Sequence, residues 1–358
     1  MTTSGVTGQF NLTADSVIDM AFRQCNVSPS EKTPDQQLYA QSALELILKS
    51  LPNDGYERWA QQTTVIGLLP YVQTYYLPNG ALEVIKVVQR QTQWPYTTGA
   101  ALASSGNAAN AFDSSLATAC IQSAPNGYIG YNFGSGNASS TVYWGVNSFG
   151  TFTYSLLLEY SNDGILWYTA DNQADTPTSY TDGQWVFYEI QFPVSAQYYR
   201  IRETGGSTLS MRSVFFGINP VDTTIGRFNR DSYETYPTKY STTSGIPIQF
   251  KVNEEPTGLY LQVWPVPTTG FYQLHVLYYT QPQDVGVLQN NLDIPYRWQK
   301  AVISQLAYEL AKYLPNIPPQ TLGNLRQDAM LLMSQVNAAD QDRSNVRFYV
   351  DMRSYFRS

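Results

Sequence analysis

His275 is the only histidine in the chain, which limits the catalytic chemistry that the sequence can support. Most general acid–base sites, catalytic triads and zinc sites use an imidazole group. Residues 271–279 alternate between the two faces of a strand, so His275 shares a face with Gln273. We therefore expect His275 to have a structural or solvated role, and we predict that the chain is not an enzyme.

The glycines and the paired carboxylates add no reactive site. Gly130 and Gly134 lack the Lys-Ser/Thr pair and the following helix of a phosphate-binding loop. Glu254 and Glu255 stand next to Pro256 in a predicted turn, where a solvated loop is the simpler interpretation.

Aromatic side chains are abundant, with 28 tyrosines, 15 phenylalanines and 7 tryptophans in 358 residues. An aromatic face suits the apolar face of a pyranose ring. A candidate glycan platform consists of Trp94, Tyr128, Trp144 and Tyr180. Packing in a core or an interface is the favoured interpretation of these residues, because tyrosine occurs throughout the chain.

Residues 343–358 combine positive charge with aromatic rings, having four arginines, one aspartate and four aromatic residues. Arginine and aromatic residues are enriched at the centres of protein interfaces, so we predict a partner-docking arm. A nucleic-acid contact and a frayed tail are the alternatives. The docking residues are Arg347, Phe348, Tyr349, Arg353, Tyr355, Phe356 and Arg357.

The overall composition predicts a folded protein with no affinity for polyanions. Charged residues make up 14% of the chain, and the formal net charge is −7, which argues against a surface that grips phosphate backbones. The two cysteines form no disulfide framework. The first residues lack the features of a signal peptide, and no apolar run is long enough to span a membrane, so we expect a soluble, unexported protein.

Local patterns predict helices at both ends of the chain and strands between them. Helices are expected to begin at Thr13 and at Thr33, the second with Pro34 in its first turn, and to pack as a hairpin. Residues 71–77 and 81–88 predict a β-hairpin around a Pro-Asn-Gly turn. Further segments predict paired strands at 259–263 and 272–279, and helices at 296–314 and about 320–338.

Residues 91–220 differ from the rest of the chain. This block has three arginines, no lysine and eight acidic residues, so its formal charge is −5. It also contains Trp94, Trp144, Trp167 and Trp185, and its short alternating segments predict a β-sandwich.

The simplest fold class is therefore α+β, with a discontinuous core of residues 1–90 and 221–342. An all-β sandwich of residues 91–220 is inserted in this core, and the arm of residues 343–358 follows it. The junctions near Arg90 and Pro220 must then lie close together. We expect Trp144, Trp167 and Trp185 to anchor a core that lets the sandwich fold alone.

The discontinuous core resembles the head-to-tail adaptor family of short-tailed bacteriophages, also called tail tubular protein A or head-completion proteins. The matching segments are 13–25, the helix 33–51 with Asn53-Asp54-Gly55 and Trp59, residues 236–250, 259–267, 274–278 and 294–298. The resemblance implies a ring, commonly twelvefold, that sits between the portal protein and the tail nozzle protein and extends the DNA channel. DNA would pass without sequence-specific binding, and the protein would be located in the tail or neck of the virion after assembly in the host cytoplasm, without contact to a membrane. The docking arm would then order against the portal.

The inserted block resembles discoidin-like domains, which are galactose-binding-type jelly-roll sandwiches. The matching segments are 158–167 with its Asp163-Gly164 turn and Trp167, then 110–118, 127–134 and 197–202. The resemblance implies a structural calcium site at Asn110, Asp113 and Thr118, for which a polar turn is the alternative; no other cofactor is expected.

Together these features predict a structural connector without turnover. Its insert would be a peripheral module that binds a fibre or whisker protein or a glycan. The alternative is a carbohydrate-binding protein that acts through the discoidin-like domain.

Overall fold

The computed structural model describes residues 11–340 except 29, 54–57, 92–95, 236–244, 256–257, 269–271 and 316. Its contacts divide the chain into two compact units. A helical unit contains residues 1–62, 80–82 and 279–358, and a β-rich unit contains residues 63–79 and 83–278. The mixed α+β class is confirmed, while the identity of the core as an adaptor stays a prediction.

The helical unit consists of four long helices around one apolar core. They are α1 (Ala14–Gln24), α2 (Pro34–Ser50), α4 (Tyr296–Tyr313) and α5 (Pro319–Asp340). Both predicted starts are confirmed, because the Thr13 and Thr33 side chains accept hydrogen bonds from the first-turn N–H groups of Ser16 and Gln36. Fully buried Trp298 of α4 lies in the core that α1 and α2 share. Among the described residues, no helix is long and apolar enough to cross a membrane.

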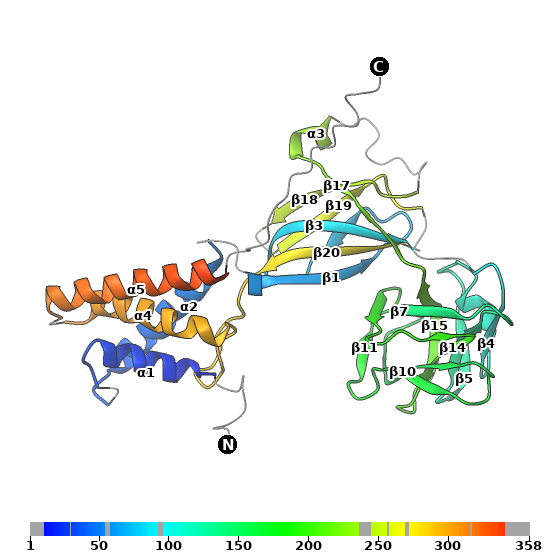
Figure 1. Cartoon of the computed structure of the whole chain (residues 1–358), viewed down its shortest axis with the longest axis horizontal. Coiled ribbons are helices and arrows are strands. Elements are labelled where there is room, and N and C mark those ends of the chain that lie inside the picture. Colours follow the sequence, from blue (N-terminus) through cyan, green and yellow to red (C-terminus); the bar gives the residue numbers. More distant parts are fainter. Residues whose placement is uncertain are drawn as a thin grey trace. The chain divides into compact units, whose positions relative to one another are not determined.

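Two four-stranded sheets form the first part of the β-rich unit (Figure 1). The first has the order β1 (Gln61–Gly67), β20 (Tyr272–Thr280), β3 (Ala81–Gln91), β16 (Val221–Thr224). The second has the order β17 (Gly226–Arg227), β18 (Gln249–Glu255), β19 (Gly258–Trp264), β2 (Thr74–Tyr76). A short helix, α3 (Arg230–Glu234), follows β17.

Two predicted strand pairings are wrong. β2 and β3 do not form a hairpin, because β2 pairs with β19 whereas β3 pairs with β20 and β16. The segments at 259–263 and 272–279 are both strands, but they belong to different sheets. Sequence alternation identifies a strand, but its partner is chosen by contacts far along the chain.

The rest of the β-rich unit is a sandwich, which we define as strands β4 to β15. One sheet has the order β10-β9-β14-β6-β4, the other has β12-β7-β15-β5 with β13 beside β7, and β8 pairs with β11. The bounds are β4 (Ala100–Ala103), β5 (Cys120–Pro125), β6 (Tyr128–Asn132), β7 (Ser139–Ser148), β8 (Phe152–Tyr154), β9 (Leu156–Ser161), β10 (Tyr168–Asn172), β11 (Thr178–Tyr180), β12 (Trp185–Glu189), β13 (Ser195–Ala196), β14 (Tyr198–Glu203) and β15 (Thr208–Ile218).

The two ends of the inserted block meet on neighbouring strands. Val221 of β16 pairs with Gln91 of β3, and Asp222 pairs with Arg90. The Arg90 Nε and Nη2 atoms donate to the two carboxylate oxygens of Asp222 at 2.7 and 2.9 Å. The prediction that the junctions lie close together is confirmed.

Only one of the three expected tryptophan anchors lies in the sandwich core. Trp144 is fully buried, whereas Trp167 and Trp185 are half-buried and lie outside the core cluster. Trp185 packs against Gly67 of β1, where an added Cβ atom would come within 2.7 Å of the Trp185 Cβ atom. Trp167 packs against Arg200 instead. The ability of the sandwich to fold alone stays a prediction.

Candidate ligand site at the loop end of the sandwich

The predicted glycan platform does not form from Trp144 and Tyr180, because both side chains are buried. The Trp144 Nε1–H group donates to Asp171 at 2.7 Å, and its ring stacks on Tyr188 with centroids 4.6 Å apart. The hydroxyl groups of Tyr180 and Tyr188 are 2.7 Å apart. Tyr128 is half-buried, and Trp94 lies outside the described residues. The prediction is wrong for Trp144 and Tyr180 because the pleat of their strands points them into the core.

Of the three predicted calcium ligands, Asn110 lies in the 3₁₀ turn Ala108–Ala111, and Asp113 and Thr118 lie on the loop between this turn and β5. Asp113 accepts hydrogen bonds from the Ser115 N–H group at 2.9 Å and from the Thr118 hydroxyl at 2.6 Å. The Asn110 amide donates to the Ala119 carbonyl at 2.9 Å. These contacts fit the polar-turn alternative. No group of three or more His, Cys, Asp and Glu side chains is placed for metal binding in the described part of the chain, and calcium stays a prediction.

A β-bulge in β15 directs Arg212 toward the same loop. Met211 pairs with Ser148 of β7, and Ser213 pairs with the adjacent residue Asn147. Arg212 is therefore the extra residue of the bulge and has no paired residue on β7. A bulge of this kind redirects a side chain at the end of a sheet. The local alternation of the sequence gives no sign of it.

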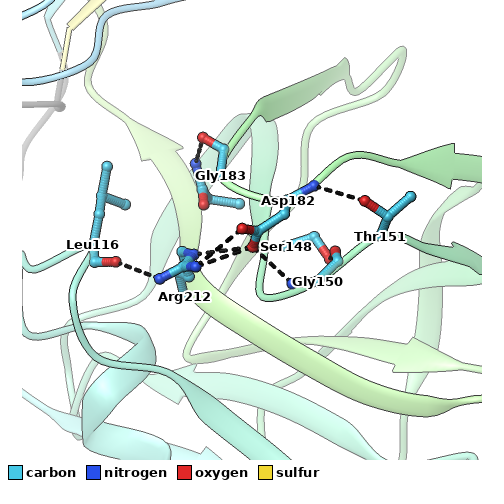
Figure 2. A network of polar contacts seen from close by, with 8 residues as sticks. Leu116, Ser148, Gly150, Thr151, Asp182, Gly183 and Arg212 are labelled. Atoms are coloured by element: carbon cyan, nitrogen blue, oxygen red, sulfur yellow. Dashed lines mark hydrogen bonds and ion pairs between the residues drawn. The ribbon is translucent and has the colours of Figure 1, made fainter.

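The Arg212 guanidinium joins three loops, as Figure 2 shows. Its Nη1 atom donates to the Leu116 carbonyl at 2.9 Å, and its Nη2 atom donates to the Asp182 carboxylate at 3.0 and 3.2 Å. The Asp182 carboxylate also accepts from the Gly150 N–H group at 2.7 Å, while the Asp182 N–H group donates to Thr151 at 3.3 Å. The loop that contains Asp113 and Thr118 is therefore tied to the two loops after β7 and β11.

Asp182 is ionised in this arrangement. The Gly150 N–H group and then the Arg212 guanidinium lower the pKa of the Asp182 carboxyl below its ordinary value. The Arg212 side chain is 20% exposed and that of Asp182 is 50% exposed, so the ion pair is accessible from solvent.

The Phe149 ring lies next to this ion pair, and the Phe152 ring lies next to Gly150. The Arg212 guanidinium carbon is 4.7 Å from the centre of the Phe149 ring. Phe149 is 38% exposed and Phe152 is 44% exposed. Gly150 between them has a φ of +92°, and an added Cβ atom there would come within 2.6 Å of the Phe152 ring, so glycine is required. We call Phe149, Phe152, Asp182 and Arg212 the loop-end site.

The loop-end site combines the two features that bind a sugar. In general, exposed rings can pack on the C–H groups of a pyranose, a guanidinium can donate to its hydroxyl groups, and a carboxylate can accept from them. Sequence reasoning missed all four residues. The one available signal was that Arg212 is one of only three cationic residues in the block 91–220.

Two other predicted groups have different outcomes. His275 lies beside Gln273, with its Nε2 atom 3.3 Å from the Gln273 Oε1 atom, so the shared face is confirmed. Burial, and then the charge of Arg90, lowers the pKa of His275, which favours the neutral ring. The docking arm lies outside the described residues.

No protein-family model matches the sequence, and no curated protein matches it. Solved structures that resemble part of the chain include chitosan-binding module 1 of a chitosanase/glucanase from Paenibacillus sp. IK-5, with 23% identity and a TM-score of 0.28, covering 34% of this chain and 97% of that chain. They also include the family 32 carbohydrate-binding module of NanJ from C. perfringens in complex with galactose, with 14% identity and a TM-score of 0.29, covering 37% and 99%. The likeness covers about a third of this chain.

Proposed function

We propose that the sandwich binds a neutral sugar residue at the loop-end site. The observation that carries this proposal is the exposed Phe149 ring beside the Arg212–Asp182 ion pair, with 4.7 Å between ring centre and guanidinium carbon. The site is held in place before a ligand arrives, because Arg212 and Asp182 are bound to the backbone of two loops. Fixed groups lose little conformational entropy on binding.

A glycan array with the full chain tests this proposal, followed by calorimetry with the sugar that binds. Phe149→Ala should weaken binding about tenfold, because it removes one aromatic contact face. Phe192→Ala is the matched control, since Phe192 is 75% exposed and follows β12 whereas Asp182 precedes it, and this variant should leave binding unchanged. An array without any neutral glycan ligand, or equal losses in the two variants, would contradict the proposal.

We further propose that the chain as a whole is a structural adaptor of a phage tail. The exposed apolar residues of two helices support it. Leu38 and Leu46 are 64% and 71% exposed on one face of α2, and Met330 and Leu331 are 62% and 53% exposed on α5. Large exposed apolar side chains that gather on one face mark interaction surfaces.

In this proposal, copies of the chain form a ring, commonly twelvefold, between the portal protein and the tail nozzle protein. The ring extends the DNA channel in the virion and performs no catalysis, and the sandwich contacts a fibre protein, a whisker protein or a glycan.

Sedimentation velocity of the full chain, alone and with the portal protein of the same genome, tests the adaptor proposal. Leu46→Glu and Met330→Glu should abolish ring formation, whereas Leu166→Glu, at an exposed residue of the sandwich, should not. A stable lone dimer that ignores the portal would contradict the proposal.

A further inference from the structure

A second polar cluster lies on the outer face of the five-stranded sheet of the sandwich. Arg200 of β14 pairs with Glu159 of β9 on one side and with Gly130 of β6 on the other. The neighbouring residues Ile201 and Leu158 are fully buried. Because side chains alternate across a strand, Arg200 and Glu159 lie on the opposite, outward face.

Glu159 binds two guanidinium groups at once. Its carboxylate accepts from the Arg200 Nε atom at 2.6 Å and from the Arg202 Nε and Nη2 atoms at 2.9 and 2.8 Å. Burial disfavours the charged carboxylate, but the hydrogen bonds from Arg202 and Arg200 outweigh it, so the pKa of Glu159 lies below its ordinary value. Two positive charges thus share one negative charge, and the cluster has a net charge of about +1.

Both arginines retain N–H groups that are not used in binding Glu159. Within the described part of the chain, neither terminal nitrogen of Arg200 has a hydrogen-bond partner, and the same is true of the Arg202 Nη1 atom. The two side chains are 16% and 36% exposed. Because both guanidinium groups already bind the same carboxylate, they lie close enough for one further planar anion to contact both.

Aromatic rings hold Arg200 in place. Its guanidinium carbon is 3.8 Å from the centre of the Trp167 ring and 4.8 Å from that of the Tyr128 ring. Gly130 makes room for this position, since an added Cβ atom would come within 2.6 Å of the Arg200 Cβ atom. The guanidinium is thus prearranged, and a stacked arginine retains its N–H groups for a ligand.

Two neutral polar groups extend the cluster along β6. Among the residues that the structure describes, the Tyr128 hydroxyl and the Asn132 Nδ2 group have no hydrogen-bond partner. Both side chains are half-buried, and their spacing of four residues places them on the same face as Arg200. A sugar hydroxyl can bind to such groups, and their spread along β6 on both sides of Gly130 suits a ligand that is larger than a simple anion.

We propose that Arg200 and Arg202, together with Trp167, Tyr128 and Asn132, form a binding site for a uronic acid residue. The sugar carboxylate binds to the free guanidinium N–H groups, and its hydroxyl groups bind to Tyr128 and Asn132. A single acidic sugar fits better than a polyanion, because residues 91–220 have a formal charge of −5 with only three arginines. We call this group of five residues the sheet-face site; it shares no residue with the loop-end site.

Calorimetry or NMR titration of the full chain with methyl β-D-glucuronide and with uncharged methyl β-D-glucoside tests this proposal. The glucuronide should bind about tenfold more tightly, because its carboxylate accepts charge-assisted hydrogen bonds. Arg200→Lys and Arg202→Lys, which keep the charge but lose the planar fork, should each remove most of this difference. Arg227→Lys, at an arginine that is 47% exposed and belongs to neither proposed site, is the matched control and should leave this difference unchanged.

Three results would overturn the assignment. Equal binding of the two sugars would exclude recognition of the carboxylate. If acetate binds as tightly as the glucuronide and displaces it, the site binds a carboxylate without contacting the rest of the sugar. Tighter binding of N-acetylglutamate amide would assign the cluster to an acidic protein side chain. Circular dichroism of each variant separates lost binding from lost folding, and the Phe149→Ala result decides the loop-end proposal independently.

Discussion

Replacing Glu159 by glutamine should destabilise the sandwich strongly at neutral pH. The substitution retains the shape of the side chain but removes the charge that holds Arg200 and Arg202 together. The Glu159 side chain is only 7% exposed and accepts three hydrogen bonds from the two arginines. In the variant, the new NH₂ group would face a guanidinium donor, so at least one buried contact would be lost and replaced by repulsion.

The magnitude follows from the burial of the three partners. Removing one partner of a buried ion pair costs about 3–5 kcal/mol. Arg202 is 36% exposed, so water can hydrate its guanidinium in the variant. We therefore expect a destabilisation at the lower end of this range, about 3 kcal/mol. Since 1.4 kcal/mol is a factor of ten, this corresponds to roughly a hundredfold change in an opening equilibrium.

The destabilisation caused by Glu159→Gln should become smaller as the pH falls. The pKa of Glu159 is lower in the folded chain than its ordinary value of about 4.3. Its stabilising contribution is therefore complete above the ordinary pKa and is lost as the pH falls through the folded-state pKa. The difference between wild type and Glu159→Gln should be constant from pH 7 to pH 6 and should shrink below about pH 4.

Hydrogen–deuterium exchange of the full chain measures this difference at each pH. Amides of β14 should exchange roughly a hundredfold faster in the variant at pH 7, while those of α4 in the helical unit serve as an internal reference. Glu189→Gln is the matched control, because that side chain is 74% exposed. A change below about tenfold at pH 7, or an equal difference at pH 3, would refute the reasoning.

Three further substitutions test the packing. Gly130→Ala places a Cβ atom 2.5 Å from the Tyr199 carbonyl oxygen, so we expect a loss of about 2 kcal/mol in urea unfolding. Trp144→Phe removes the donor to Asp171 and leaves a cavity, and tryptophan-fluorescence melting should show a loss of about 3 kcal/mol. Thr33→Ala removes the capping box of α2 and should cost about 1 kcal/mol, measured as faster exchange of the first-turn amides.

Local features of the fold could be predicted from the sequence, because their causes lie within a few residues. The caps at Thr13 and Thr33 need only a hydroxyl and the N–H groups three residues on. The meeting of Arg90 and Asp222 was also predictable, since a chain that leaves a core must return to it.

Strand partners and burial could not be predicted in the same way. β2 and β3 are separated by a turn sequence that suits a hairpin, yet β2 pairs with β19 and β3 pairs with β16 and β20, all of which are more than 100 residues further along the chain. Four tryptophans of the inserted block look alike in sequence, but Trp144 is in the core and Trp167 is half-buried beside Arg200. Alternation assigns residues to two faces without saying which face is covered.

The three arginines of the inserted block explain why its two proposed sites should prefer different ligands. Arg212 is matched by Asp182, so the loop-end site has no excess charge and suits a neutral sugar. Arg200 and Arg202 share Glu159, so the sheet-face site has an excess of one positive charge. Charges in solvent-accessible sites are screened over about 10 Å at 0.1 M salt. Added salt should therefore weaken glucuronide binding at the sheet-face site but leave a neutral sugar at the loop-end site unaffected, because only the first interaction depends on an unbalanced charge.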